Sequence, residues 1–255
     1  MNHFAADHVG ATVIPSPNFG PRAGAREPDM IVLHYTGMPD HEQALSWLCN
    51  PDSQVSSHYF IHEDGRIVQL VPESERAWHA GKSCWGGESD VNSASIGIEV
   101  ANAGHPAGLP EFPTAQVDAL IRLCRDCGRR WQIAPERILA HSDVAPIRKL
   151  DPGENFPWGR LHAEGVGHWV QPAPIGGGRF FQLGEVGQPI EALQSMLSLY
   201  GYDVEINGSF DQRTKGVVEA FQRHFRPERV DGIADISTID TLHRLLTSLP
   251  RYNRA

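Results

Sequence analysis

Two histidines and one aspartate in this chain have the residue types and the local setting of a metal site that activates water. His34 lies in the apolar run MIVLHYT, whereas His141 and Asp151 belong to the segment HSDVAPIRKLDPG at 141–153. Two imidazoles and one carboxylate leave the fourth position of a tetrahedral zinc ion to water, as in catalytic zinc sites. Zinc lowers the pKa of such a water to about 7. The three residues therefore predict zinc-assisted hydrolysis.

Two further residues could complete such a site. Lys149 precedes Asp151 by two residues, so an extended backbone would place both side chains on one side, where the ammonium could stabilise an oxyanion. Arg148 is a rival for this role. Glu99 lies within the otherwise apolar segment 96–100, where a carboxylate is costly unless it is paired or functional, and it is the candidate acid/base. The structural alternatives are a solvated lysine and a glutamate at an exposed strand end.

Other titratable residues compete for these roles. His58 and His62 alternate along one predicted strand and could imitate a metal pair. Asp143 could replace Asp151 as the carboxylate ligand, and His79, within the segment AWHAG, could contact substrate. The more specific zinc motif HExxH is absent.

A CxxC pair at Cys124 and Cys127 offers a redox or zinc interpretation. However, Val117, Leu120 and Ile121 repeat with these cysteines at helical spacing, and no second CxxC completes a site of four thiolates. We therefore expect buried helix thiols.

The periodicity predicts an α/β fold with a central mixed sheet flanked by helices, followed by a small all-α three-helix domain. Apolar runs and a hairpin turn at Asp64-Gly65 place the strands, and 3.6-residue periodicity places the helices. The predicted strands are 30–35, 57–62, 66–71, 95–101 and 137–141, and the predicted helices of the sheet domain are 41–48 and 114–131.

Composition divides the chain into four parts. Residues 1–28 are rich in Pro, Gly and Ala and predict an extended arm, and 29–170 hold the candidate zinc site. A Gly- and Pro-containing linker is expected at 171–186. Apolar spacing then predicts three helices within 187–250, a bundle small enough to have little stability to spare.

The bulk composition excludes some classes of partner. The 255-residue chain has a net charge of −9, which argues against a nucleic-acid partner because phosphate binding needs a basic surface. The sequence contains no run of 18 or more apolar residues, so it predicts no membrane span. Residues 1–24 do not resemble a signal peptide. This predicts a cytoplasmic protein, or a periplasmic or wall-associated one if a signal was removed or export is unconventional. The oligomeric state stays open.

Five segments, taken in order, resemble the type-2 zinc-dependent N-acetylmuramoyl-L-alanine amidases, which share a fold with the phage-T7-type lysozyme amidase and with peptidoglycan recognition proteins. The segments are VLHYTG at 32–37, SSHYFIHEDGRIVQLVPE at 56–73, AWHAG at 77–81, SIGIEVAN at 95–102 and AHSDVAPIRKLDPG at 140–153. They cover most of residues 28–160.

The resemblance implies one zinc ion per chain on His34, His141 and Asp151. It also implies Glu99 as the catalytic acid/base and Lys149 as the transition-state stabiliser, and it assigns His58 and His62 to a structural strand. The predicted substrate contacts are Tyr35, His79, Asn102 and Arg148.

The C-terminal segment is similar to peptidoglycan-binding domains of the three-helix type. Its matching pieces are a Leu-Tyr-Gly-Tyr turn at 199–202, Gly-Ser-Phe-Asp at 208–211 and Ala-Phe-Gln at 220–222.

Together these features predict hydrolysis of the amide between (anhydro-)N-acetylmuramic acid and L-alanine of the stem peptide, in cell-wall recycling or turnover. The expected partners are peptidoglycan or anhydro-muropeptides. The absence of a signal favours the soluble substrate, whereas the C-terminal domain favours the polymer. The alternatives are a non-catalytic peptidoglycan recognition protein and a zinc peptidase that cuts within the stem.

Overall fold

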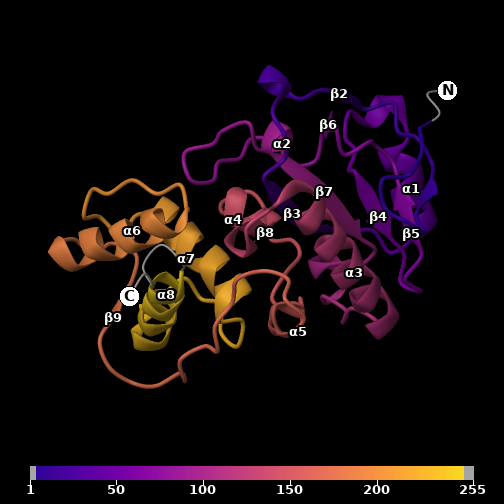
Figure 1. The fold of residues 1–255 in the computed structure, drawn as a ribbon. Coiled ribbons are helices and arrows are strands. Elements are labelled where there is room, and N and C mark those ends of the chain that lie inside the picture. Colours follow the sequence, from indigo (N-terminus) through magenta and orange to yellow (C-terminus); the bar gives the residue numbers. More distant parts are fainter. Residues whose placement is uncertain (1–3, 250–255) are drawn as a thin grey trace.

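A six-stranded mixed sheet forms the centre of the larger domain in the computed structural model, which describes residues 4–249 (Figure 1). The strand order is β1-β5-β4-β7-β3-β8. Strand β3 runs parallel to β7 and β8, and β4 runs parallel to β7 but antiparallel to β5. The predicted mixed sheet, including the hairpin of β4 and β5, is therefore confirmed.

The elements follow the chain in this order. The strands are β1 (Thr12–Val13), β2 (Phe19–Pro21), β3 (Met30–Tyr35), β4 (Tyr59–Ile61), β5 (Ile67–Gln69), β6 (Glu75–Ala77), β7 (Ser95–Val100), β8 (Ile138–Ala140), β9 (Phe180–Phe181) and β10 (Ala234–Asp235). The α-helices are α1 (His41–Leu48), α2 (Val91–Ala94), α3 (Thr114–Trp131), α4 (His141–Val144), α5 (Trp158–Ala163), α6 (Gln188–Tyr200), α7 (Gln212–Phe225) and α8 (Ile236–Ser248), with short 3-10 turns at Ala23–Ala25, Pro51–Ser53, His105–Ala107 and Pro135–Arg137.

Strand alternation decides which side chains meet which helices. Ile31 and Leu33 of β3 belong to a buried cluster with residues of α3, whereas Met30 and Val32 point to the opposite face. His34 continues the Met30–Val32 face at the carboxyl end of β3. The sheet thus places a polar side chain of β3 away from α3, on the side covered by α1.

Residues 4–28, the described part of the predicted arm, pair with the sheet domain through two short strands. Strand β1 pairs with β5, and β2 pairs with β6. Arg22 is buried and donates hydrogen bonds to the backbone oxygens of Glu73, Ser93 and Ser95. Residues 1–3 of the predicted arm lie outside the described residues.

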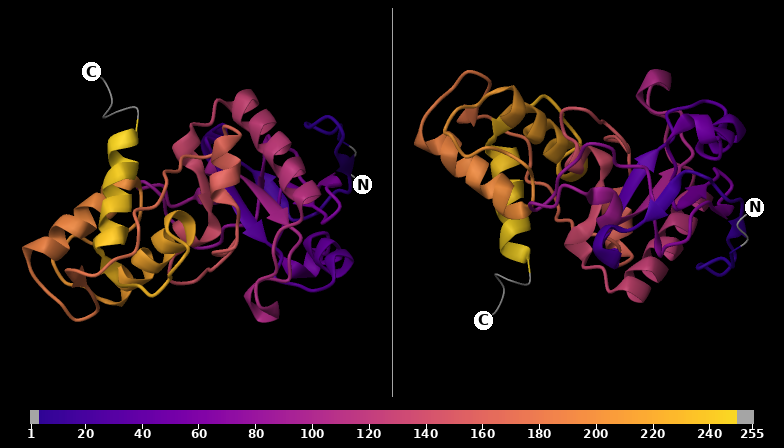
Figure 2. Two further views of the ribbon diagram at one scale, coloured as in Figure 1. Left: turned by 90° about the horizontal axis from the view of Figure 1, so that it is seen from below. Right: turned by 90° about the horizontal axis from the view of Figure 1, so that it is seen from above.

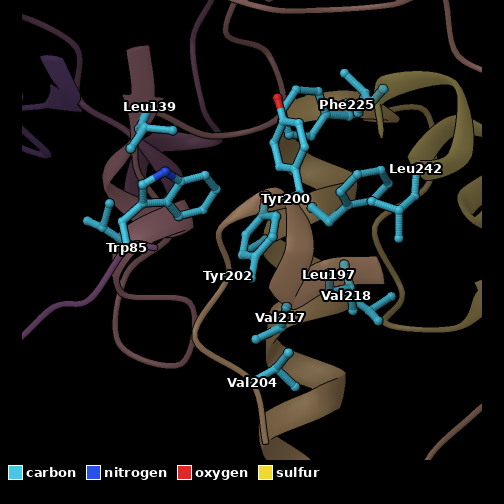
Figure 3. Packing of buried hydrophobic residues seen from close by; sticks show 14 of the residues in the cluster. Trp85, Leu139, Leu197, Tyr200, Tyr202, Val204, Val217, Val218, Phe225 and Leu242 are labelled. Carbon is cyan, nitrogen blue, oxygen red and sulfur yellow. The ribbon is translucent and has the colours of Figure 1, made fainter. Parts of the chain in front are cut away.

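The three predicted C-terminal helices are present as α6, α7 and α8, and they lie together beside the sheet domain (Figure 2). The linker contains β9, which pairs with β10. One buried cluster joins the two domains, because Val32, Leu139 and Val144 of the sheet domain belong to it with Leu197 and Phe221 of the bundle. Figure 3 shows Trp85 and Leu139 facing this core.

None of the helices within 4–249 combines the length and the apolar character that a membrane crossing requires.

Cys124 and Cys127 are free thiols buried on α3, so the prediction of structural helix cysteines is confirmed. Burial raises the pKa of both thiols. Such thiols are poor nucleophiles and poor metal ligands in their protonated form.

The carboxylate of Glu73 ties α3 to the sheet. It accepts hydrogen bonds from Tyr59 Oη (2.6 Å), Cys127 Sγ (3.2 Å), Trp131 Nε1 (2.5 Å) and the Arg130 guanidinium (2.7 and 2.8 Å). Burial by itself would raise the pKa of Glu73, but these donors, led by Arg130, lower it to about 2. The ionised form of Glu73 therefore stabilises the fold.

Replacing Glu73 by Gln keeps the shape of the side chain but removes the charge. We expect the free energy of unfolding to fall by about 3 kcal/mol at pH 7, as for other broken buried pairs. Because the pKa is lowered in the folded state, the contribution is complete above the unfolded pKa of about 4.3 and is lost as the pH falls toward 2. Urea unfolding between pH 7 and 2 should show the two proteins converging. Exposed Glu111→Gln is the control, and a difference independent of pH would contradict the charge argument.

Candidate functional site

A cavity of about 480 Å³ opens beside the carboxyl ends of β3 and β7. The strands contribute His34 and Glu99, and the segment after β6 contributes Trp78 and His79. Helix α4 with the loop after it contributes His141 and residues 148–151, and α1 with the segments beside it contributes further lining residues. All five residues predicted to bind zinc or to catalyse line this cavity: His34, Glu99, His141, Lys149 and Asp151. No residue of 4–28 lines it.

Three ligand atoms converge at the floor of the cavity. His34 Nδ1 lies 2.8 Å from His141 Nδ1 and 3.1 Å from Asp151 Oδ2, and His141 Nδ1 lies 2.9 Å from the same oxygen. All three residues are buried, and they are the one group of His, Cys, Asp or Glu in residues 4–249 arranged to hold a metal ion. Two imidazoles and a carboxylate are the donor set of catalytic zinc sites.

A chain of hydrogen bonds orients His34. Ser95 Oγ donates to the Val91 carbonyl (2.6 Å), so it accepts from His79 Nε2–H (3.1 Å). The other ring nitrogen of His79, Nδ1, then accepts from His34 Nε2–H (3.0 Å). This leaves the lone pair of His34 Nδ1 for a metal, which is the usual task of a residue behind a metal ligand. His79, predicted to contact substrate, lines the cavity but has both nitrogens committed to this chain.

The ring of His141 is held in the same way. Its Nε2–H donates to the Ala80 carbonyl (3.1 Å), which leaves Nδ1 free for a metal. The Arg148 guanidinium donates to the same carbonyl (2.5 Å) and to that of Lys82 (2.9 Å). Arg148, predicted to contact substrate, therefore lines the cavity while it fixes the backbone that orients His141.

The protonation states suit a divalent metal. Burial and the neighbouring His141 lower the pKa of His34 to about 4, so its imidazole is neutral at pH 7. Burial alone would raise the pKa of Asp151, but His141 and His34 hold it well below its ordinary value. Neutral imidazoles and an ionised carboxylate are the forms that bind zinc.

Glu99 stands directly beside His34, because the two are register partners on parallel strands β7 and β3. Its Oε2 is buried and has no hydrogen-bond partner among the described residues. Burial, and then the Asp151 charge, raise the pKa of Glu99 well above its ordinary value, while Lys149 opposes this rise. A carboxyl with an unpartnered oxygen and a raised pKa has the properties expected of a general acid/base.

The competing candidates lie elsewhere. His58 Nδ1 accepts from the Gly97 N–H (2.9 Å), and its Nε2 lies 2.9 Å from the Glu75 carbonyl oxygen, so this ring is structural. Neither His58 nor His62 joins the metal group. The carboxylate of Asp143 accepts from Ala140 N (2.8 Å) and from the C-terminal domain, so it does not replace Asp151.

Of the two remaining predicted substrate contacts, Tyr35 lines the cavity and Asn102 does not. Tyr35 lines the cavity, and its hydroxyl donates to His105 Nδ1 (2.9 Å), whose Nε2–H donates to Glu154 (3.0 Å). Asn102 is not brought to the cavity. Its side chain is buried, donates to the Pro110 carbonyl (2.9 Å) and accepts from Gly104 N (2.8 Å), so it organises the loop after β7.

Sequence reasoning missed the apolar rim and the residues behind the ligands. Trp47, Val55 and Leu150 line the cavity and are 50%, 37% and 40% exposed. A signal existed for Trp47, which lies off the buried stripe of α1 formed by Ala44, Leu45 and Leu48. Ser95 carried no signal, because its role depends on the packing of β7 against the segment after β6.

Comparison with known proteins agrees with this geometry. Residues 24–154 match the N-acetylmuramoyl-L-alanine amidase family, and residues 186–242 match a putative peptidoglycan binding domain. The chain is 41% identical over 224 residues to N-acetylmuramoyl-L-alanine amidase AmiD of Escherichia coli K12, covering 82% of this chain and 79% of the relative.

Two solved structures share most of the architecture. E. coli AmiD, in complex with the substrate anhydro-N-acetylmuramic acid-L-Ala-D-gamma-Glu-L-Lys, superimposes with a TM-score of 0.73 at 39% identity, over 88% of this chain and 91% of that one. AMPDH3 from Pseudomonas aeruginosa, in complex with anhydromuramic pentapeptide, gives a TM-score of 0.70 at 27% identity, over 94% and 97%. The chain belongs to the N-acetylmuramoyl-L-alanine amidase family and carries a C-terminal domain of the peptidoglycan-binding type.

Proposed function

We propose that this amidase cuts the amide between the lactyl group of anhydro-N-acetylmuramic acid and L-alanine, with zinc held by His34, His141 and Asp151. The observation that carries the proposal is the convergence of three oriented ligand atoms next to a glutamate with an unpartnered carboxyl oxygen. Zinc, when bound, supplies a Lewis acid that polarises water and the scissile carbonyl.

Glu99 moves the proton in this scheme. Its carboxylate accepts a proton from the attacking water and then donates it to the nitrogen of L-alanine as the C–N bond breaks. The products are the lactyl carboxylic acid and a free amine, so the protons balance. The raised pKa of Glu99 suits both halves of this transfer.

Lys149 stabilises the negative charge that develops on the carbonyl oxygen. It is half-buried in the lining of the cavity and close enough to His34 and Glu99 to affect the pKa of both. A cation in a site from which water is partly excluded stabilises a developing oxyanion more strongly than a cation in bulk water does. Arg148 is the weaker candidate because two carbonyls already occupy its guanidinium.

The soluble anhydro-muropeptide is our proposed substrate. AmiD and AMPDH3 are described with anhydromuramyl peptides, and the cavity adds an apolar rim at Trp47 on which a sugar ring could stack. Polymeric peptidoglycan is the second candidate, favoured by the match of residues 186–242 to a peptidoglycan binding domain.

A digest tests the function. Zinc-loaded protein should release intact stem peptide from 1,6-anhydro-muropeptide, detected by mass spectrometry. Incubation with intact sacculi decides whether the polymer is also cut. Glu99→Gln should retain zinc and lose activity by about 10²-fold or more, because only the proton transfer is removed. Binding of muropeptide without turnover would favour a recognition protein, and fragments cut within the stem would favour a peptidase.

Lys149→Met should lower kcat about 10²–10³-fold while zinc affinity stays unchanged, because the ammonium acts on the transition state. Lys82→Met, on the neighbouring loop, is the matched control and should retain activity. Initial rates on anhydro-muropeptide and a chelator competition provide the two readouts. A change only in KM would show that Lys149 binds the ground state instead.

Gly97→Ala tests the packing behind the metal ligands. A Cβ at Gly97 would lie 2.4 Å from His79 Cγ, so we expect a loss of about 1–3 kcal/mol in unfolding free energy. His79→Ala removes the obstructing ring, so the double variant should lose less than the sum of the single losses. Gly128→Ala on α3, where a Cβ meets nothing within 4 Å, is the control. Additive losses in denaturant unfolding would contradict the contact.

A further inference from the structure

A buried carboxylate lies where the two domains meet. Asp143, two residues after the candidate ligand His141 on α4, has no solvent exposure. Its Oδ2 accepts from the Ala140 N–H (2.8 Å) and from His224 Nδ1 (2.7 Å), and its Oδ1 accepts from the Tyr202 hydroxyl (2.6 Å). Two of its three hydrogen-bond donors therefore come from the C-terminal domain.

Hydrogen bonds connect Asp143 and its helical turn to the backbone beside both candidate ligands of this loop. Its carboxylate fixes the backbone N–H of Ala140, the residue directly before His141. Its own helical turn is tied to the ligand loop, since Ser142 N donates to the Asp151 carbonyl (2.9 Å). A shift of Asp143 would thus move the backbone of both ligands that come from this loop.

Both donors from the C-terminal domain pack against aromatic side chains of the sheet domain. The His224 ring is stacked between Trp158 (centroids 3.6 Å apart) and Phe225 (3.8 Å). The Tyr202 ring packs edge-on against Trp85 at 4.9 Å. Trp158 and Trp85 belong to the sheet domain, so these donors are positioned by contacts across the boundary. Figure 3 shows the Trp85 and Tyr202 side chains of this contact.

The backbone itself takes part in the docking. Gly86 N donates to the Gly201 carbonyl across the boundary (2.8 Å). A Cβ at Gly201 would lie 2.5 Å from Trp85 Cε2, so the approach requires glycine there. With the hydrophobic cluster that both domains share, this is a fixed interface and not that of a domain on a free tether.

We propose that the docked C-terminal domain supports the catalytic site. Tyr202 and His224 are positioning residues that hold the His141–Asp151 loop in place through their hydrogen bonds to Asp143. The inference rests on the proposed zinc site. If the domain undocked, Asp143 would keep one donor and would have to be rehydrated, since a buried carboxylate without partners is costly. The domain thereby acquires a role in metal binding separate from any contact with cell wall.

Full-length variants test this by zinc affinity, measured by chelator competition without substrate, together with the visible spectrum of the Co²⁺-substituted protein. Tyr202→Phe removes one donor and keeps the ring. His224→Phe keeps a stacked ring without the donor, whereas His224→Asn keeps a donor near the Nδ1 position and loses the stack. The matched control is Tyr200→Phe, since Tyr200 lies in the same aromatic cluster and its hydroxyl lies 2.9 Å from His168 Nδ1.

We expect Tyr202→Phe and His224→Phe together to weaken zinc binding about tenfold and to change the Co²⁺ spectrum, as for other residues behind metal ligands. Tyr200→Phe should leave both unchanged, and His224→Asn should retain most of the affinity. The inference is overturned if the wild type binds zinc and the double variant binds it equally well. It is also overturned if His224→Phe, which keeps the stacked ring, retains zinc affinity while His224→Asn, which keeps the donor, loses it. A wild type that binds no zinc would overturn the proposed function as well.

Discussion

The parallel pairing of β3 with β7 and β8 is the constraint on which the rest of the site depends. Register sets His34 opposite Glu99, and it sets Leu33 opposite Ala140, the residue before His141. Because neighbouring parallel strands end at the same edge of the sheet, the candidate ligand His34, the proposed proton carrier Glu99 and the start of the loop with the other candidate ligands meet there. The fold therefore assembles the reacting groups from three segments distant in sequence.

The residues behind His34 and His141 decide which ring nitrogens of this candidate metal site are available to an ion. An imidazole binds metal through one nitrogen, and the hydrogen bond on the other nitrogen selects which one. The chain from Ser95 through His79 selects Nδ1 of His34, and the Ala80 carbonyl selects Nδ1 of His141. Gly97 belongs to this arrangement, since its missing side chain is what admits the His79 ring beside the strand.

The two domains share more than a linker. The bundle would bury a small core alone, but Val32, Leu139 and Val144 extend that core into the sheet domain. The hydrogen bonds of Tyr202 and His224 to Asp143 then link this apolar contact to the loop that carries the candidate ligands His141 and Asp151. A module that matches a wall-binding domain can therefore also serve as a structural support for the chemistry next to it.

Much of this protein could be predicted from its sequence because the informative signals are local. Periodicity located helices 41–48 and 114–131, and ordered motifs identified His34, Glu99, His141, Lys149 and Asp151, which line one cavity. The tertiary structure decided what depends on contacts between distant segments. It placed Asn102 in a loop network and Asp143 at the domain boundary, and it set the His79 ring against His34 and the Arg148 guanidinium against the Ala80 carbonyl. No local pattern encodes these partners, since each hydrogen bond joins groups whose proximity arises only when the strands pair and the domains dock.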